Sequence, residues 1–241
     1  MTEQTINADF SSLSLEYDRY RIGYPPDLYE TIRSFGLRSG GKILDVACGT
    51  GLSAEPFASM GCHVSGIDTS PQMLEYARRR VPTGEFVEGS AEKLPFADKT
   101  FDGVACAQAF QWFNTPAAMS EFQRVTKTGG VVAIWWKHLS NDDPVRAVRE
   151  SVYDAMGAGP LPEGLMKGFT TFYGAPFKQR HVRVLRFPYL SSVERYVGYE
   201  RSRLNARLHF GERVGEYYER LEAALKERFG DDDAQLWLSY S

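Results

Sequence analysis

The sequence predicts an α/β fold: a seven-stranded, mostly parallel sheet with helices on both faces, an N-terminal helical lid and a helical insertion before the last strand. From residue 42 onward, short β-branched or apolar runs alternate with longer amphipathic segments, which is the pattern of parallel strands joined by helices. The chain has 241 residues, of which 43% are hydrophobic, so it can bury one substantial core. We therefore expect a single domain over residues 1–241.

Five strands are expected before residue 137 and two after it, where the regular alternation breaks. Their ranges are 42–47, 62–67, 84–88, 101–107 and 129–136, followed by 181–187 and 234–240. Helices should fill the gaps, and Thr69-Ser70-Pro71 marks the start of one of them with a capping side chain and a first-turn proline. The predicted helices cover residues 25–36, 52–60, 70–80, 116–127, 144–156, 191–208 and 211–229.

The composition argues against several classes of partner. With 28 basic and 31 acidic residues the net charge is −3, so no general field attracts a polyanion, and nucleic acid is not an expected partner. The three cysteines lack C-x-x-C spacing, which indicates neither a disulfide framework nor a zinc site, and no metal is expected. The N-terminus lacks an apolar signal core, and no window reaches the roughly 18 apolar residues of a membrane span. We expect a soluble, cytoplasmic protein whose oligomeric state the sequence leaves open.

A glycine-rich turn and a distant carboxylate mark the expected ligand-binding edge. Ligands of open parallel sheets bind outside the carboxyl ends of the strands. Gly49-Thr50-Gly51 follows the first predicted strand, and its missing side chains allow a ligand to approach the backbone. Asp68 follows the second strand, where a carboxylate can accept hydrogen bonds from both hydroxyls of a ribose. This combination indicates a nucleoside cofactor.

The glycine turn alone leaves the class of cofactor open. Residues 49–54 also satisfy the dinucleotide pattern G-x-G-x-x-A, so an NAD(P)-dependent oxidoreductase is one alternative, and a non-catalytic nucleoside-binding protein is another. Three features favour a cofactor other than a dinucleotide. Asp45 lies inside the first strand, where it would repel a pyrophosphate; the run GSAEKLPF (89–96) follows the third strand; and no Tyr-x-x-x-Lys pair occurs in the chain.

Together with these features, five stretches resemble the class I S-adenosylmethionine-dependent methyltransferases, in the small-molecule branch (methyltransferase type 11) of the ubiquinone/menaquinone and trans-aconitate methyltransferases. They occur in the order of that family: ILDVACGTG (43–51), GIDTSPQMLEYAR (66–78), GSAEKLPF (89–96), FDGVACAQAFQWF (101–113) and TKTGGVVAIW (126–135). The resemblance implies a Rossmann-like fold and S-adenosyl-L-methionine as cofactor. It also implies an N-terminal lid and helix over 1–38, a cofactor-binding core over 40–137, and substrate-cap elements with the last two strands over 138–241.

The resemblance also implies roles for individual residues around the cofactor. Asp45 would organise the amino-acid end, Asp68 would hold the ribose, Met73 would pack on the adenine, and Gln108 would lie beside the methionine moiety. Asp68 can alternatively be read as a carboxylate at a helix N-terminus, and Met73 as plain helix core. The implied cofactor-binding set is Asp45, Ala47, Gly49, Gly51, Asp68, Thr69, Met73, Ser90, Ala91 and Gln108, with Tyr17 and Arg21 from the N-terminal segment.

The N-terminal segment carries a second resemblance. Residues 16–25 are similar to the pattern Y-x-x-Y-R-P-x-Y-P of this branch, with Ile22 in place of a proline. Tyr17 and Tyr20 are candidate lid residues, and Arg21 could pair with a carboxylate of cofactor or substrate. The alternative is a surface cap over the helix predicted at 25–36.

The stretch QAFQWF (108–113) follows the fourth strand at the expected edge. Related members have histidine where this chain has Gln111, and glutamine can orient a substrate but cannot act as a general base near neutral pH. Trp112 can line a flat apolar pocket, with buried core as the alternative. His138, at the end of the fifth strand, is the one histidine considered as a base. The candidate catalytic residues are therefore Gln111, Trp112, Tyr20 and His138.

The function that these observations favour is methyl transfer from S-adenosylmethionine to oxygen or nitrogen of a small molecule. The acceptor would be a small acid or an aromatic heterocycle, and catalysis would depend mainly on proximity and alignment. Carbon methylation of a quinone-type precursor is the alternative within the class.

Overall fold

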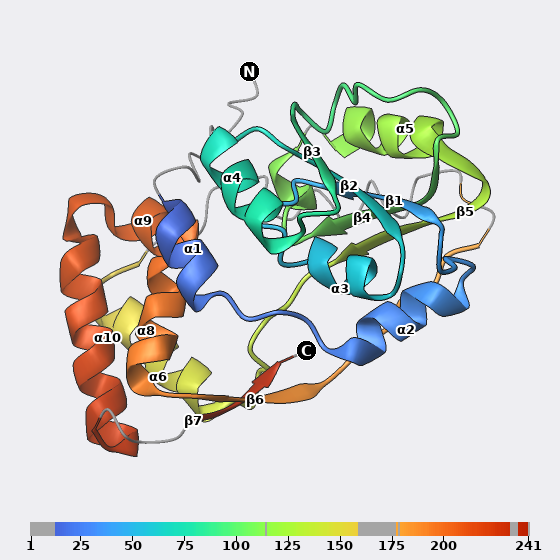
Figure 1. Cartoon of the computed structure of the whole chain (residues 1–241). Helices are drawn as coiled ribbons and strands as arrows, with labels where there is room; N and C mark the ends of the chain where they lie inside the picture. The colour runs from blue at the N-terminus through green and yellow to red at the C-terminus, as the bar shows by residue number, and fades with distance from the viewer. Residues whose placement is uncertain (1–12, 114, 159–176, 178, 232–235, 241) are drawn as a thin grey trace. The chain divides into compact units, whose positions relative to one another are not determined.

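The computed structural model describes residues 13–113, 115–158, 177, 179–231 and 236–240 (Figure 1). The chain divides into two compact units. Among the described residues, the core unit contains 13–14, 22–113, 115–136, 177 and 179–181, and the helical unit contains 15–21, 137–158, 182–231 and 236–240.

A parallel five-stranded sheet forms the centre of the core unit. Its strands are β1 (Lys42–Val46), β2 (His63–Asp68), β3 (Glu85–Glu88), β4 (Phe101–Ala107) and β5 (Thr126–Trp135), in the spatial order β3-β2-β1-β4-β5. The chain runs outward from β1 through β2 to β3 and then returns to the other side of β1 as β4. This reversal creates a topological switch point beside the carboxyl end of β1, where sheets of this kind bind ligands.

Helices cover both faces of this sheet, as predicted (Figure 1). Alternate residues of β1 point to opposite faces, so that Ile43 packs into one buried cluster and Leu44 into the other. The cluster around Ile43 includes residues of α2 (Pro26–Ser34), α3 (Ala54–Ser59) and α4 (Pro71–Arg80), whereas the cluster around Leu44 includes residues of α5 (Thr115–Val125). The result is a three-layer α/β/α unit with a core on each side of the sheet.

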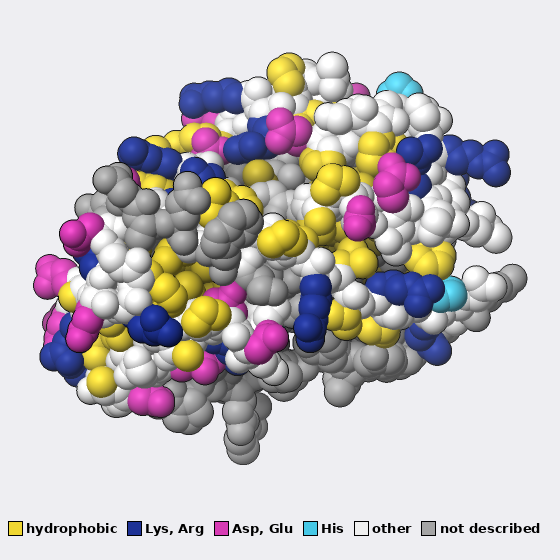
Figure 2. All heavy atoms as spheres, turned by 90° about the horizontal axis from the view of Figure 1, so that it is seen from below, with side chains coloured by type: hydrophobic (Ala, Val, Ile, Leu, Met, Phe, Trp, Pro, Cys, Tyr) yellow, Lys and Arg dark blue, Asp and Glu magenta, His cyan; other side chains and the backbone are white. Residues whose placement is uncertain are grey.

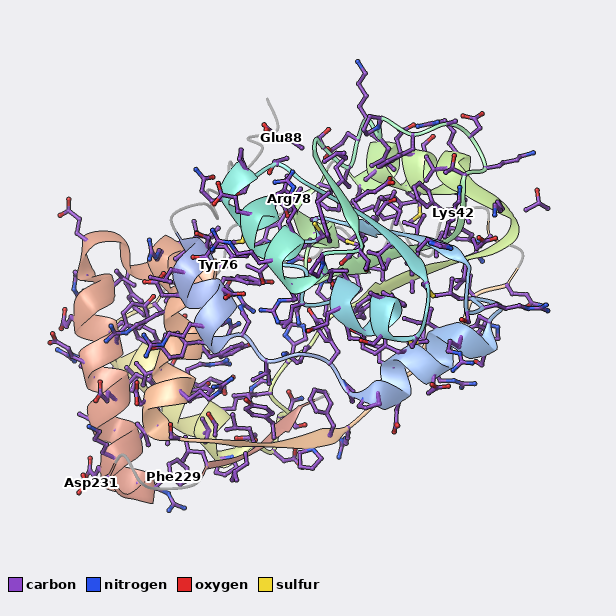
Figure 3. All side chains as sticks on the ribbon, viewed as in Figure 1. Lys42, Tyr76, Arg78, Glu88, Phe229 and Asp231 are labelled. Carbon is purple, nitrogen blue, oxygen red and sulfur yellow. The ribbon has the colours of Figure 1, made fainter. Side chains whose placement is uncertain are left out.

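The start of α4 is fixed by the sequence signal that predicted it. Ser70 is the N-cap, and its hydroxyl oxygen accepts a hydrogen bond from the backbone N–H of Met73 at 3.2 Å, while Pro71 occupies the first turn. At the other end of the helix, Arg78 (labelled in Figure 3) donates to the carbonyl oxygen of Phe86 in β3 at 2.8 Å. The helix therefore has a defined beginning next to β2 and a side-chain tie to β3.

The helical unit contains α1 (Ser14–Tyr20), α6 (Pro144–Ala155), α8 (Val193–Arg201), α9 (Leu204–Phe210) and α10 (Val214–Phe229). Helix α10 contacts α6, α8 and α9, and aromatic rings fill the space among them. Tyr217 of α10 lies 4.9 Å, centroid to centroid, from the rings of both Tyr153 and Phe210. Two further strands, β6 (Phe187–Ser191) and β7 (Leu236–Tyr240), form an antiparallel pair of their own.

The prediction of a seven-stranded sheet is therefore not confirmed: among the described residues, five strands form the parallel sheet and β6 pairs with β7 separately. The strand predicted at 181–187 is wrong, because β6 begins at Phe187 and the preceding Val182 and Val184 are exposed. Local β-propensity suggested that strand, but strand formation is decided by pairing. Residues 234 and 235 of the last predicted strand, and residues 1–12 of the predicted lid, lie outside the described residues.

Two helix predictions also need correction. The helix predicted over 191–208 is interrupted: the Ser202 hydroxyl donates to the carbonyl oxygen of Tyr199 at 2.6 Å, and Arg203 is extended, with φ −98° and ψ 133°. A capping hydroxyl that engages a helical carbonyl offers the backbone an alternative to further helix. The helix predicted over 116–127 ends at Val125, and β5 starts at once with Thr126 instead of at residue 129.

Among the described residues drawn in Figure 2, charged side chains of both signs are interspersed on the face shown. Within the described residues, no helix combines the length and the apolar character needed to cross a bilayer.

Candidate functional site

The turn after β1 has the backbone geometry that its glycines predicted. Ala47, Gly49 and Gly51 all have positive φ angles, of 54°, 52° and 78°. A Cβ at Gly51 would stand 3.1 Å from the Cα of Ala77, so the turn packs against α4 more closely than a larger residue allows. A positive φ is uncommon for alanine, and Ala47 adopts it where the chain leaves the sheet. The turn is therefore held in one specific conformation against α4.

Asp68 at the end of β2 links this turn to the start of α4. One carboxylate oxygen accepts from the backbone N–H of Gly49 at 2.9 Å, and the other accepts from the N–H of Ser70 at 2.9 Å. Burial raises the pKa of Asp68, whereas these backbone hydrogen bonds act in the opposite direction. The backbone N–H of Thr69 also bonds to this carboxylate. A carboxylate has about four acceptor positions, so part of its acceptor capacity remains for a ligand. The predicted glycine turn and acid are thus brought together.

Asp45 lies beneath the turn instead of at its surface. It is fully buried, and the Ser53 hydroxyl donates to one of its oxygens at 2.6 Å, while the other oxygen is buried without a hydrogen-bond partner. Desolvation raises the pKa of Asp45 to about 7. Asp45 can therefore influence a ligand through the turn that it supports. The carboxylate oxygen without a partner can accept a hydrogen bond from a ligand or from a water.

The residues expected near an adenine surround the carboxyl ends of β2 and β3. The backbone N–H of Gly89 donates to the carbonyl oxygen of Asp68 at 3.0 Å, which brings the segment of Ser90 and Ala91 next to Asp68. Thr69 is exposed, Ser90 is half-buried, and Met73 and Ala91 are buried. Met73 is 2% exposed, as expected for helix core as well as for a buried wall of a site.

Gln111 is engaged in a clamp that the sequence did not reveal. Its amide nitrogen donates to the carbonyl oxygen of Gln108 at 3.0 Å, and its amide oxygen accepts from the indole N–H of Trp136 at 2.6 Å. Gln108 has φ 61°, and its own N–H donates to the carbonyl oxygen of Trp135 at 2.9 Å. The side chain of Gln111 therefore fixes the loop after β4 to the end of β5. Trp112 lies in the same loop and is half-buried.

The helical unit holds the remaining candidates. The guanidinium carbon of Arg21 lies 4.6 Å from the ring centre of Tyr17 and 5.1 Å from that of Tyr199. Arg21 also donates to the carbonyl oxygen of Ser202 at 3.1 Å. The ring of Tyr20 lies against Gly198, where any Cβ would overlap it, so α1 approaches α8 through a glycine.

His138 belongs to the same unit and has an exposed side chain. Desolvation, followed by the positive charges of Arg203, Arg146 and Arg149, lowers its pKa. The neutral imidazole is therefore favoured near pH 7, which is the form that can accept a proton.

The predicted site residues thus form two groups. The core unit gathers Asp45, Ala47, Gly49, Gly51, Asp68, Thr69, Met73, Ser90, Ala91, Gln108, Gln111 and Trp112, and the helical unit holds Tyr17, Tyr20, Arg21 and His138. No three or more histidine, cysteine or acidic side chains are placed to bind a metal ion in the described part of the chain.

Sequence reasoning missed three polar residues. Ser53 supports Asp45 in the core unit, and Lys137 and Glu200 are buried in the helical unit. Their signal was weak: Lys137 stands between Trp136 and His138, and Glu200 lies in a charged stretch of helix that reads as solvent-exposed.

A parallel sheet with this strand order, a glycine turn and a carboxylate at the switch point define a Rossmann-like domain with the geometry of a nucleoside-cofactor site. Residues 44–134 match the family model described as a methyltransferase domain. The resemblance to the class I S-adenosylmethionine-dependent methyltransferases is thereby confirmed, and the chain carries a methyltransferase domain.

Individual relatives agree with this assignment. The chain is 41% identical over 104 residues to a demethylmenaquinone methyltransferase of Renibacterium salmoninarum, a match that covers 43% of this chain and 44% of that one. The chain spans about half the length of the curated relatives that it matches.

Solved structures support the fold alone, because their sequences are distant. A structure from Anaeromyxobacter dehalogenans, provisionally assigned as a type II methyltransferase, has a TM-score of 0.71 at 20% identity, covering 92% of this chain and 94% of that one. A phosphoethanolamine N-methyltransferase of Haemonchus contortus, in complex with S-adenosylhomocysteine, has a TM-score of 0.54 at 18% identity, covering 97% of this chain and 59% of that one.

Proposed function

We propose that the chain transfers the methyl group of S-adenosylmethionine to oxygen or nitrogen of a small molecule. The observation that carries the proposal is the arrangement at Asp68, whose carboxylate ties the Gly49 turn to the start of α4 and retains acceptor positions for a ribose. The family match over residues 44–134 covers the same strands and turns. The acceptor oxygens of Asp68 and the open glycine turn therefore fit the nucleoside part of this cofactor.

The cofactor supplies an activated methyl group, because its sulfur leaves as a neutral thioether. The protein's task is then to hold the acceptor in line with the methyl–sulfur bond and to exclude water. A carboxylate or an unprotonated nitrogen needs no proton transfer, whereas a phenol or an acidic carbon benefits from a base. Since Gln111 cannot act as a general base near neutral pH and its amide oxygen accepts a hydrogen bond from Trp136, alignment of a competent nucleophile is the mechanism that we propose.

We assign a role to each candidate residue of the core unit and of the helical unit. We assign the amino-acid end of the cofactor to the turn supported by Asp45, the ribose to Asp68, and the adenine to Thr69, Met73 and the segment of Ser90 and Ala91. Gln108 is placed beside the methionine moiety. Tyr17, Tyr20 and Trp112 are assigned to the acceptor or lid side, and His138 is the proposed base if a proton must be removed.

A second candidate reaction, carbon methylation of a quinone-type precursor, is favoured by one specific finding. The relative from Renibacterium salmoninarum is named a demethylmenaquinone methyltransferase. An NAD(P)-dependent oxidoreductase and a non-catalytic nucleoside-binding protein are the candidates from other classes. Turnover with radiolabelled S-adenosylmethionine and panels of phenols, amines, carboxylic acids and naphthoquinols separates these possibilities. Label in a carboxylic-acid, amine or phenol product supports the first reaction, and label on ring carbon supports the second.

The cofactor assignment is tested by calorimetric titration of S-adenosylhomocysteine and of NADH into the purified chain. We expect binding of S-adenosylhomocysteine and no response to NADH. In Asp68→Ala, the loss of hydrogen bonds to a charged acceptor, about 1.5–3 kcal/mol, should weaken binding by roughly 10–100-fold. Glu75→Ala, which removes an exposed carboxylate from α4, is the matched control and should bind as the wild type does. Binding of NADH instead would overturn the proposal.

A further inference from the structure

The segment between β3 and β4, residues 89–100, runs beside α5 without forming a helix or a strand (Figure 1). The backbone groups of such a segment must find hydrogen-bond partners elsewhere. At its start, the N–H of Gly89 donates to the carbonyl oxygen of Asp68 at 3.0 Å, and the N–H of Lys93 donates to the carbonyl oxygen of Ser90 at 3.4 Å. The first part of the segment is therefore tied to the end of β2 and closes into a turn.

Two side chains of α5 hold the second part of the segment. One carboxylate oxygen of Glu121 accepts from the backbone N–H of Leu94 at 2.7 Å. The guanidinium of Arg124 donates to the carbonyl oxygens of Leu94 at 3.0 Å and Phe96 at 2.8 Å. The carbonyl oxygen of Arg124 in turn accepts from the N–H of Lys99 at 2.8 Å. Residues 94–99 are thus fixed to α5 through their backbone.

Glu121 and Arg124 also bind each other through two parallel hydrogen bonds. Nε of Arg124 lies 2.7 Å from Oε1 of Glu121, and Nη2 lies 2.8 Å from Oε2. This bidentate geometry fixes the plane of the guanidinium as well as its position. The hydrogen bond from Arg124 lowers the pKa of Glu121, so this carboxyl is charged near pH 7. The pair, called here the α5 ion pair, is therefore a rigid support for the segment.

Buried side chains of the segment leave it little freedom between its two ties. Ala91 is 5% exposed and Leu94 is 4% exposed, and both belong to the buried cluster around Leu44. The ring of Phe96 lies 5.1 Å, centroid to centroid, from that of Phe101 in β4. With the Gly89 bond on one side and the α5 ion pair on the other, residues 90–93 are held in one conformation.

We propose that Glu121 and Arg124 are positioning residues that set the specificity of the site for the base of the cofactor. This inference rests on the proposed function, in which the segment of Ser90 and Ala91 borders the adenine. The two side chains act through the backbone on the C-terminal side of that segment and do not touch the nucleoside. Polar groups discriminate between bases when they are held at fixed positions, because a mismatched buried group then loses its hydrogen bond.

Loss of the α5 ion pair should therefore affect the choice of base more than the binding of the ribose. The bonds of Asp68 to Gly49 and Ser70 do not involve α5, so the ribose part of the site should persist without the pair.

The test titrates S-adenosylhomocysteine and S-inosylhomocysteine, whose base has a 6-oxo group in place of the 6-amino group, into the full chain. We expect the wild type to bind the inosyl compound roughly tenfold or more weakly. In Arg124→Gln and in Glu121→Gln this preference should fall to roughly threefold or less. Arg124→Lys should not restore it, because an ammonium group cannot reproduce the planar fork.

The matched control is Arg33→Gln. Arg33 pairs with Glu30 on α2 at 3.2 Å, with the same spacing of three residues, but both side chains are exposed and the pair is remote in sequence from residues 89–100. This variant should keep the wild-type preference for the adenosyl compound.

The ratio of the two affinities guards against variants that are partly unfolded, because an unfolded fraction lowers both apparent affinities equally. Hydrogen exchange gives a readout that needs no variant: in the wild type the backbone amides of Leu94 and Lys99 should exchange slowly. Exchange at both amides as fast as in an unfolded peptide would overturn the proposal.

A purely structural role of the pair has a distinct outcome. If both glutamine variants keep the wild-type preference while their melting temperatures fall, the α5 ion pair only stabilises the fold and the proposal is wrong. Equal affinity of the wild type for the two compounds would overturn it as well. Failure of the proposed function differs from all of these, because the wild-type chain would then bind neither compound.

Discussion

Burial of the Asp45 carboxyl should lower the stability of the folded chain at neutral pH. Its carboxyl is fully buried, is bonded to Ser53 by one oxygen, and has a pKa of about 7 in the folded chain. An unfolded aspartate has a pKa of about 3.9. Between these two values the folded state binds the proton more strongly, so the free energy of unfolding should fall as the pH rises from about 4 to about 7.

Asp45→Asn should remove this dependence, because the amide cannot ionise. Relative to wild type, the variant should gain stability as the pH rises through that range, by at most on the order of 4 kcal/mol. Urea unfolding at pH 5 and pH 8 measures the difference. The exposed Asp98→Asn is the control and should not reproduce it. An equal stability difference between Asp45→Asn and wild type at both pH values would contradict the assigned pKa.

Gln111 illustrates what residue-level reading could and could not predict. The sequence showed correctly that this position lacks a base, but the acceptor bond from Trp136 at 2.6 Å and the donor bond to Gln108 at 3.0 Å depend on how β5 is placed beside β4. No local pattern encodes that pairing of distant side chains.

Gln111→Ala should therefore lower the free energy of unfolding, by about 1–3 kcal/mol, because two partly buried hydrogen bonds are lost. Chemical denaturation is the measurement. The exposed Gln72→Ala, on the first turn of α4, serves as the control. Unchanged stability of Gln111→Ala would contradict the role of this amide as a clamp between the loop after β4 and the end of β5.

Among the helices and strands, the predicted bounds were correct where a local sequence signal agreed with the observed strand pairing or helix capping. The strand 101–107 and the helix that starts after Ser70 were predicted at their observed positions, because an apolar run and a capping motif each determine a boundary. For helix α1, over Ser14–Tyr20, the sequence predicted an N-terminal helical lid without bounds, and the packing of α1 depends on Gly198 of α8. Contacts of that kind are set by tertiary structure and leave no trace in the local sequence.

Helix α8 carries the buried charge cluster of the helical unit, and Glu200→Gln tests its energetic weight. The substitution removes the charge that Arg203 and Arg149 face, so it should destabilise the chain by about 3–5 kcal/mol. Thermal and urea unfolding report the effect. Glu194→Gln, on the exposed first turn of the same helix, is the control and should change stability by less than about 0.5 kcal/mol. A loss below 1 kcal/mol for Glu200→Gln would show that the arginines are balanced by other groups.

For the whole molecule, the sequence predicted the α/β class, the parallel core and the meeting of Asp68 with the glycine turn at the switch point, because regular alternation and a glycine turn are properties of consecutive residues. It did not predict the separate pairing of β6 with β7 or the division into two units, which depend on contacts between segments far apart in the chain. The candidate site likewise contains residues that local sequence could reveal and residues that it could not. Asp68 and the glycine turn were predictable, whereas Ser53, Lys137 and Glu200 became candidates only through burial and contact.

We propose that the Asp68 carboxylate holds the ribose of S-adenosylmethionine at the turn after β1. A crystal structure of the chain with S-adenosylhomocysteine would test this role. We predict that both ribose hydroxyls lie at hydrogen-bonding distance, about 2.5–3.0 Å, from the oxygens of Asp68, while Gly49 and Ser70 keep their bonds to it. A nucleoside bound with its ribose away from Asp68 would show that this carboxylate does not hold the cofactor.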